Sequence, residues 1–285
     1  IAGDYQVDNE TGVVTWRIGA YNDVGGVIGK NSGKSTMTST YGVIEAGGAF
    51  AVLGSRNVGG VIGYNNSNVT ARIVVNGGNM RERPAEIDLP SESRTAVASG
   101  NTNGNPVSCM VISNVWAGGA IGTFTGNCAF KYKEDTTVES HWDAATGEVT
   151  FDEIGEDDYQ VSVSLPQNAL VMTLSGDNNP SAGGAVGFLD SATGSNLRIN
   201  VNNSGRIYSD ATTRGSYCGG AIGREYKCTI SNVYIHGNNA AGSIIGSGFL
   251  VYDEPNACDQ PGAVYGPNCS GGAFGYIHVE NANLH

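Results

Sequence analysis

Short apolar stretches bounded by glycine recur along the chain and dominate its pattern of hydrophobic and polar positions. Eight segments share this form: GGVIG at 25–29, GGAF at 47–50, GGVIG at 59–63, GGAIG at 118–122, GGAVG at 183–187, GGAIG at 219–223, GSIIG at 242–246 and GGAFG at 271–275. Recurrence of this kind indicates a repeat architecture, because one unit alone cannot bury its apolar face but stacked units can.

A second strand follows several copies after a polar turn. The copy at 59–63 is followed by YNNSNVTARIVVNGG, in which alternation places Ile73 and Val75 on one face and Arg72 and Val74 on the other. The Asn and Gly residues at its end tolerate the left-handed conformation of a turn. The expected unit is therefore a glycine-bounded strand, a polar turn and an alternating strand.

These units predict an all-β fold. Glycine makes up 43 of the 285 residues, about twice its usual share, and in a strand it permits close approach of neighbouring backbones. We predict one repeat-built domain over 1–285, a stack like a β-solenoid or parallel β-helix with a β-hairpin insertion. A β-sandwich with regular glycine turns is the alternative.

Two segments interrupt the repeat. The acidic stretch 131–178 lacks glycine pairs, and we expect it to be a β-hairpin insertion packed against the stack. Its HWDAATGEVTF matches the N-terminal YQVDNETGVVTWRI, so both should be hairpins that turn at Thr-Gly. The polar stretch 79–106, rich in Pro, Gly and Ser, is expected to be a long surface loop.

The sequence GG-[VA]-[IV]-G, followed by a Ser/Asn-rich turn and a second strand, resembles the GLUG repeat of large bacterial surface proteins and adhesin-like proteins. The resemblance covers about half of the chain, in 19–78, 111–130, 182–246 and 270–279. It implies an extracellular, β-solenoid-like setting, and it supplies no catalytic residue.

The excess of acidic residues argues against nucleic acids and anionic membranes as binding partners. The formal net charge is −12, from 27 acidic and 15 basic residues, which repels nucleic acid phosphates and anionic membrane surfaces. No apolar run has the length of a transmembrane helix, so we expect no membrane insertion.

The six cysteines fall into three neighbouring pairs. An even count permits three disulfides, and short loops favour Cys109–Cys128, Cys218–Cys228 and Cys258–Cys269. The alternative is buried thiols in a cytosolic protein. No Cys-x-x-Cys occurs and the histidines lie far from the cysteines in sequence, which argues against structural zinc.

Sequence motifs for catalysis are missing. GVIGKNSGKST at 26–36 has the wrong glycine spacing for a phosphate-binding loop, and β-branched and turn residues follow where a helix is needed. Neither a Gly-x-Ser-x-Gly elbow nor a His-Glu-x-x-His helix occurs. Surface or structural roles are expected for all four histidines, which are His141, His236, His278 and His285.

Acidic clusters are the remaining candidates for a site. One contains Glu153, Glu156, Asp157 and Asp158, and others lie at Asp4, Asp8 and Glu10 and at Asp177. A solvated acidic face is the favoured interpretation. Calcium bound at Asp157, Asp158 or Asp177 is the weaker alternative, and a pair of carboxylates that cleaves a glycan is another. No other cofactor is expected.

Aromatic residues and sequons leave further options open. Trp16, Trp116 and Trp142, with thirteen tyrosines, could line a sugar-binding groove, although packing in the core is favoured. Asn65, Asn68, Asn202 and Asn268 begin Asn-x-Ser/Thr sequons that a eukaryotic secretory pathway could glycosylate.

Together these features favour a non-enzymatic structural or adhesive protein, secreted or on a cell surface, that assembles with itself into a fibre or surface layer. Edge strands at the ends of a stack are templates for pairing, and the C-terminal strand expected at 273–279 has little sequence left to cap it. A protein on the same scaffold that binds glycans, or cleaves them as a polysaccharide lyase or glycoside hydrolase, is the alternative.

Overall fold

A computed structural model shows that the protein is all-β and built mainly of parallel sheets. It describes residues 3–7, 14–18, 22–32, 42–48, 50–78, 87–88, 109–167, 169–174, 179–209, 216–239, 244–246, 264–266, 269–278 and 283–284. The helical content of these residues is one 3₁₀ turn, Glu156–Asp158. The all-β prediction is confirmed.

Four six-stranded sheets form the body. Sheet I contains β6 (Ala51–Gly54), β11 (Met110–Ser113), β17 (Leu170–Thr173), β21 (Arg206–Ser209), β26 (Val264–Gly266) and β25 (Ile244–Gly246). Sheet II contains β3 (Asp23–Gly25), β7 (Asn57–Gly59), β12 (Trp116–Gly118), β18 (Ser181–Gly183), β22 (Tyr217–Gly219) and β27 (Cys269–Gly271).

The other two sheets follow the same order. Sheet III contains β4 (Ile28–Ser32), β8 (Ile62–Asn66), β13 (Ile121–Phe124), β19 (Val186–Asp190), β23 (Ile222–Tyr226) and β28 (Phe274–Tyr276). Sheet IV contains β5 (Val43–Gly48), β9 (Arg72–Gly77), β16 (Val161–Leu165), β20 (Thr193–Asn203), β24 (Thr229–Asn239) and β29 (Asn283–Leu284).

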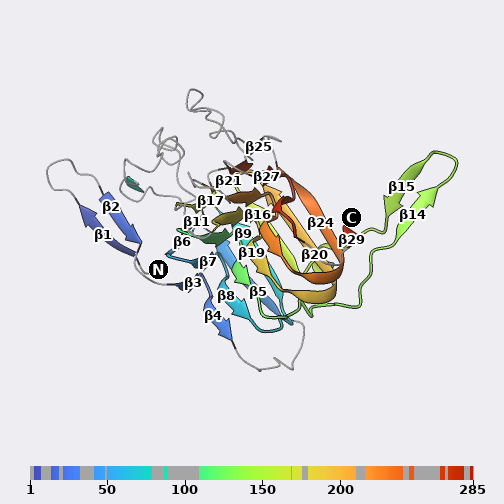
Figure 1. Cartoon of the computed structure of the whole chain (residues 1–285), viewed down its shortest axis with the longest axis horizontal. Helices are drawn as coiled ribbons and strands as arrows, with labels where there is room; N and C mark the ends of the chain where they lie inside the picture. Colours follow the sequence, from blue (N-terminus) through green and yellow to red (C-terminus); the bar gives the residue numbers. More distant parts are fainter. Residues whose placement is uncertain are drawn as a thin grey trace.

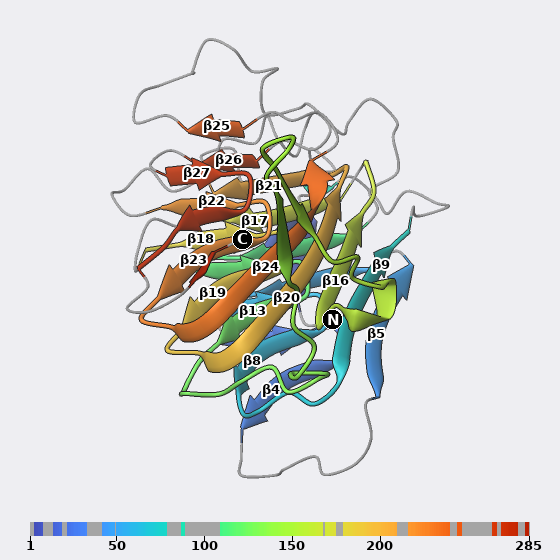
Figure 2. The same cartoon turned by 90° about the vertical axis from the view of Figure 1, so that its right-hand side faces the viewer.

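From β6 to β24 the strands of the stack follow one another through the sheets in a fixed order. The chain passes through β6, β7, β8 and β9, and then returns to sheet I at β11, which pairs in parallel with β6. We call each such set of consecutive strands a rung and count β3, β4 and β5 as the first, so that β6–β9 form the second. Figures 1 and 2 show the rungs in colour order from blue to red. All pairing in these sheets is parallel, unlike the antiparallel pairing expected of the alternative β-sandwich.

Six of the eight glycine-bounded copies stack in register where sheet II passes into sheet III. Gly25 pairs with Gly59, and the series continues through Gly118, Gly183, Gly219 and Gly271. A Cβ atom at the Gly59 position would lie 2.0 Å from the carbonyl oxygen of Ile62. Glycine is therefore required here by the close approach of backbones.

The remaining two copies lie elsewhere. GGAF at 47–50 spans the end of β5 and the residues just before β6, and GSIIG at 242–246 ends in β25 of sheet I. These two segments resemble the other six in sequence but have different neighbouring strands in the structure.

The core follows the predicted alternation only in part. Ile73 and Val75 are fully buried, as expected for the inward face. Arg72 and Val74, on the outward face of β9, are also buried. The Arg72 side chain pairs with Glu156 and Asp157, so residues between β15 and β16 cover this part of sheet IV.

The antiparallel strand pairs of both predicted hairpins are confirmed, and the Thr-Gly turn expected at 11–12 lies outside the described residues. β1 (Gly3–Val7) pairs antiparallel with β2 (Val14–Ile18), which also pairs with β10 (Ile87–Asp88). β14 (Ser140–Asp143) pairs antiparallel with β15 (Glu148–Phe151). The hairpins project from opposite sides of the body in Figure 1.

The predicted bounds of the insertion, 131–178, are too wide. β16 and β17 fall within them, yet β16 pairs with β9 and β20, and β17 pairs with β11 and β21. With their apolar residues, β16 completes the third rung and β17 begins the fourth. The segment outside the stack is 131–160, which we call the insertion. Of the loop predicted at 79–106, only residues 87–88 belong to the described part.

Candidate functional site

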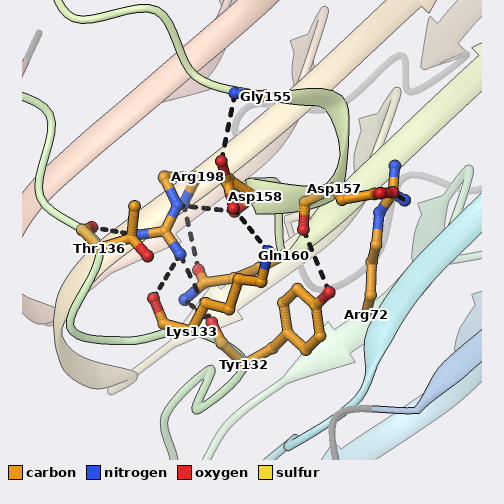
Figure 3. Close-up of polar contacts among 9 residues, drawn as sticks. All are labelled: Arg72, Tyr132, Lys133, Thr136, Gly155, Asp157, Asp158, Gln160 and Arg198. Carbon is orange, nitrogen blue, oxygen red and sulfur yellow. Dashed lines mark hydrogen bonds and ion pairs between the residues drawn. The ribbon is translucent and has the colours of Figure 1, made fainter.

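Arg198, on β20, is a buried cation that fastens the insertion to sheet IV (Figure 3). Its Nε donates to the carbonyl oxygen of Asp158 at 2.7 Å, and its Nη2 donates to that of Lys133 at 2.6 Å. Its Nη1 donates to the carbonyl oxygen of Thr136. Because these acceptors lie near both ends of the insertion, one side chain holds the two ends together.

Gln160 provides a second attachment beside it. Its Nε2 donates to the carbonyl oxygens of Phe130 and Tyr132 at 3.2 and 3.0 Å, and its Oε1 accepts from the backbone N–H of Arg198 at 3.1 Å. The side chain is fully buried. A buried amide with several partners fixes one arrangement, since any other would leave polar groups without hydrogen bonds.

Arg72 holds the 3₁₀ turn of the insertion. Its Nη1 lies 2.5 Å from Oδ1 of Asp157, and its Nη2 lies 3.8 Å from Oε1 of Glu156. The Nη2 also donates to Oγ of Ser162 at 3.3 Å. The acidic turn is thus paired with a cation from a strand 85 residues away in sequence.

Lys133 and Asp158 form the third ion pair, with Nζ 2.7 Å from Oδ1. The hydrogen bond from Lys133 lowers the pKa of the Asp158 carboxyl, and the same bond raises the pKa of Lys133. Burial lowers the pKa of Arg198, while the charges of Asp158 and Asp135 oppose this effect. Of the weak calcium candidates, Asp157 is paired with Arg72 and Asp158 with Lys133, and Asp177 lies outside the described residues.

The hairpin β14–β15 carries an exposed apolar pair. Trp142 is 65% exposed and Val149 is 51% exposed, and the two residues are cross-strand partners. Figure 1 shows the hairpin extending away from the stacked sheets. The two side chains together form a small exposed apolar surface on a projecting element.

The opposite face of this hairpin brings together three groups that can bind metals. Glu139, His141 and Asp152 each offer a ligand atom, and these atoms lie within 4.8 Å of one another. Nε2 of His141 lies 2.6 Å from Oδ1 of Asp152, whose Oδ2 accepts from the backbone N–H of Glu139 at 3.2 Å. The hydrogen bond with Asp152 raises the pKa of His141 and lowers that of Asp152.

Aromatic residues on the outside of sheets II and III stack on one another. The rings of Trp116 and Phe188 are stacked with centroids 5.1 Å apart. The guanidinium of Arg224 lies 4.9 Å from the centroid of Phe188 and 5.4 Å from that of Tyr217. These ring faces are occupied by each other and by Arg224, but Trp116 is only half-buried and lies outside the core. The expectation of a core position is wrong for Trp142, which is exposed because it lies on the projecting hairpin. The side chain of Trp16 lies outside the description.

The predicted disulfides are not formed. Cys109, Cys128, Cys218 and Cys228 take part in no disulfide, and neither does Cys269. The reason is topological: Cys109 lies just before β11 of sheet I, whereas Cys128 follows β13 of sheet III, so a short sequence separation spans two sheets. Cys218 and Cys228 are likewise separated, on β22 and after β23. Cys258 lies outside the described residues.

Three of the four sequon asparagines belong to the described chain. Asn65 is fully buried, and its side chain accepts from Asn31 at 2.7 Å and donates to the Ser67 carbonyl at 2.6 Å, which leaves no room for a glycan. Asn68 and Asn202 are exposed. Asn268 lies outside the described part.

Sequence reasoning missed the cations of this site. The acidic cluster at 153–158 contains no Lys or Arg of its own, yet Arg72 and Arg198 reach it from sheet IV. One signal could have located them: Ile73 and Ile199 both pair with Val161, so ARIVVN and LRINVN place arginine at the same strand position. Alignment of the second strands would have shown this recurrence.

No protein-family model, curated protein or solved structure matches the chain. In the part of the chain that the structure describes, no helix has the length and apolar character to cross a membrane.

Proposed function

We propose that the four stacked sheets form a β-solenoid and that the chain is a non-enzymatic structural and adhesive protein, secreted or on a cell surface, which assembles head to tail with itself. The resemblance of its repeats to those of surface proteins supports the location. The pairing of Asp157 and Asp158 with cations supports a structural use of the acids rather than a catalytic one.

One observation carries the proposal of assembly. The third residue of each stacked repeat points into the core, and it is at most 1% exposed in Val61, Ala120, Ala185 and Ala221. Val27, the same residue of the first rung, is 53% exposed. An apolar core position thus lies open at the end of the stack, where a further rung would cover it.

The backbone hydrogen bonds between these third residues of the repeats support the same conclusion. Val27 N donates to Val61 O, and the series continues in the same direction until Ala221 N donates to Ala273 O. In this series each residue donates its N–H to the carbonyl of the corresponding residue in the next rung. Among the described residues, the series therefore leaves the carbonyl of Val27 at one end and the N–H of Ala273 at the other. These two groups are the acceptor and donor that the same bond requires between two copies.

The C-terminal end of the stack is incompletely filled. A cavity of about 290 Å³ lies beside Ala273, Ile235 and Val201. An open first rung at one end and an unfilled last rung at the other suit a heterologous contact, which generates open filaments when the rotation does not close.

Sedimentation velocity over a range of concentrations tests this proposal. The wild-type chain should shift to larger species as its concentration rises, and Val27→Lys should remain a monomer because stacking would bury an unpaired charge. Val149→Lys, at a valine of similar exposure on the hairpin, is the matched control and should assemble like the wild type. A wild-type chain that stays monomeric, or equal effects of the two variants, would contradict the proposal.

Glycan binding is the second candidate, favoured by the exposed ring of Trp142. Aromatic faces that are free of other rings can stack on sugars. Titration with oligosaccharides should then change the tryptophan fluorescence of the wild type and leave Trp142→Ala unaffected. Equal responses of both proteins would exclude this residue as the binding platform.

A further inference from the structure

Three candidate ligands lie on one face of the hairpin: His141 is in β14, Glu139 directly precedes that strand, and Asp152 directly follows β15. Trp142 and His141 are adjacent in β14, so their side chains point to opposite faces. His141 pairs with Thr150 across the hairpin, and Asp152, two residues after Thr150, lies on the same face. Glu139 lies two residues before His141, and its carbonyl oxygen accepts from the backbone N–H of Asp152 at 3.0 Å. Two strands thus bring the three side chains to one point.

The hairpin itself does not require these residues. β1–β2 has the same register, with Val7 opposite Val14 where β14–β15 has Trp142 opposite Val149. At the positions that correspond to Glu139, His141 and Asp152, the first hairpin has Asp4, Gln6 and Arg17. The two hairpins pair alike although one carries a cation in this position, so the ligand set of the second needs an explanation other than folding.

The surrounding charge favours a cation. Between Lys133 and Arg198 the sequence contains no Lys or Arg, whereas Glu139, Asp143, Glu148 and Asp152 are all acidic. A bound divalent ion would therefore meet no competing cation from this stretch. The face is exposed, so water can complete the coordination shell.

We propose that Glu139, His141 and Asp152 form a binding site for a divalent transition metal ion of the zinc class. One imidazole with two carboxylates suits zinc and its neighbours, while magnesium and calcium prefer oxygen ligands alone. Three protein ligands with an open position filled by water are a familiar zinc arrangement. The present 2.6 Å contact between His141 and Asp152 would open by a small side-chain rotation to admit the ion.

The test is isothermal titration of the full chain with zinc chloride. The wild type should bind one ion through this site, and His141→Ala and Asp152→Asn should each weaken this binding by about tenfold or more. Glu148→Gln is the matched control, because it removes a carboxylate from the same hairpin outside the ligand set, and it should bind as tightly as the wild type.

A second measurement separates binding at the site from loss of structure. The His141 ring resonances in NMR spectra should shift on addition of zinc in the wild type and in Glu148→Gln. Absence of binding by a folded wild type would show that His141 and Asp152 form an ion pair only, and would overturn the proposal. Equal weakening by Glu148→Gln and Asp152→Asn would overturn it too, since it would indicate diffuse attraction to acidic residues.

Discussion

Nη2 of Arg198 donates a hydrogen bond of 2.6 Å to the carbonyl oxygen of Lys133, 65 residues earlier in the chain. The bond joins the fourth rung to the start of the insertion. Further bonds from the same guanidinium reach Asp158 and Thr136. This buried side chain is therefore a main anchor of the insertion, beside the attachments made by Gln160 and Arg72.

Arg198→Met should therefore lower the free energy of unfolding by about 2–4 kcal/mol, because several backbone carbonyls lose their charged donor. Urea unfolding measures the loss, and limited proteolysis should show faster cleavage within 131–160. The control is Lys131→Met, which removes a partly exposed ion pair with Glu134 and should cost less than about 1 kcal/mol. Similar losses in both variants would refute the anchoring role of Arg198.

The stacked glycines should tolerate no side chain. A Cβ atom at Gly118 would lie 1.8 Å from the carbonyl oxygen of Ile121, whereas the nearest atom at Gly47 is 3.7 Å away. Gly118→Ala should destabilise the protein by about 4 kcal/mol or more, and Gly47→Ala should remain within about 0.5 kcal/mol of the wild type. Thermal unfolding of the two variants checks this, and equal melting temperatures would show that the close packing of rungs is mistaken.

The Lys133–Asp158 pair should make stability depend on pH. The folded pKa of Asp158 is lowered, so its contribution is present above the ordinary carboxyl value and is lost as pH falls through the folded pKa. The folded pKa of Lys133 is raised, so its contribution is lost only as pH rises through that raised value. The pair therefore stabilises the fold between these two limits.

Asp158→Asn should accordingly melt below the wild type at pH 7, and the difference should shrink as the pH is lowered beneath the folded pKa of Asp158. Differential scanning calorimetry at several pH values gives this comparison. A difference that stays constant down to the most acidic conditions would indicate that the carboxylate charge contributes nothing.

Cys128 and Cys228 should carry unmodified, poorly reactive thiols. Burial raises the pKa of both, so little thiolate is present at neutral pH. Iodoacetamide should modify them slowly in the native protein and readily after unfolding without a reductant, as peptide mass mapping would show. Recovery of a Cys109–Cys128 or Cys218–Cys228 linked peptide from the unreduced protein would contradict the structure.

The repeat could be recognised from sequence because its requirements are local. Each stacked glycine pair marks a place where backbones approach closely, and the alternation of Ile73 and Val75 marks an inward face. The Thr-Gly dipeptides at 11–12 and 146–147 in the sequence were enough to predict the two antiparallel strand pairs. These features depend on neighbouring residues in the chain, so a reader of the sequence sees them directly.

The contacts between rungs could not be read in the same way. Strand β16 looked like part of an acidic insertion until its pairing with β9 and β20 placed it in the stack. Cys109 and Cys128 are close in sequence but belong to different sides of a rung. Asp157 pairs with Arg72, which lies 85 positions earlier in the sequence. The residues next to either one do not indicate which partner it will meet.

Cross-linking between two variants tests head-to-tail stacking of the solenoid. In sheet III, Lys30 pairs with Tyr64 at the first edge, and the residue at the same register in the last strand is Tyr276. In a head-to-tail dimer, residue 276 of one copy would lie next to residue 30 of the other, about 4.8 Å away between strands, within the range that a disulfide spans. A mixture of Lys30→Cys and Tyr276→Cys chains should therefore form a disulfide-linked dimer on mild oxidation. Neither variant alone, nor the parent chain, should form it, and a mixture that yields no more dimer than these controls would contradict the proposed assembly.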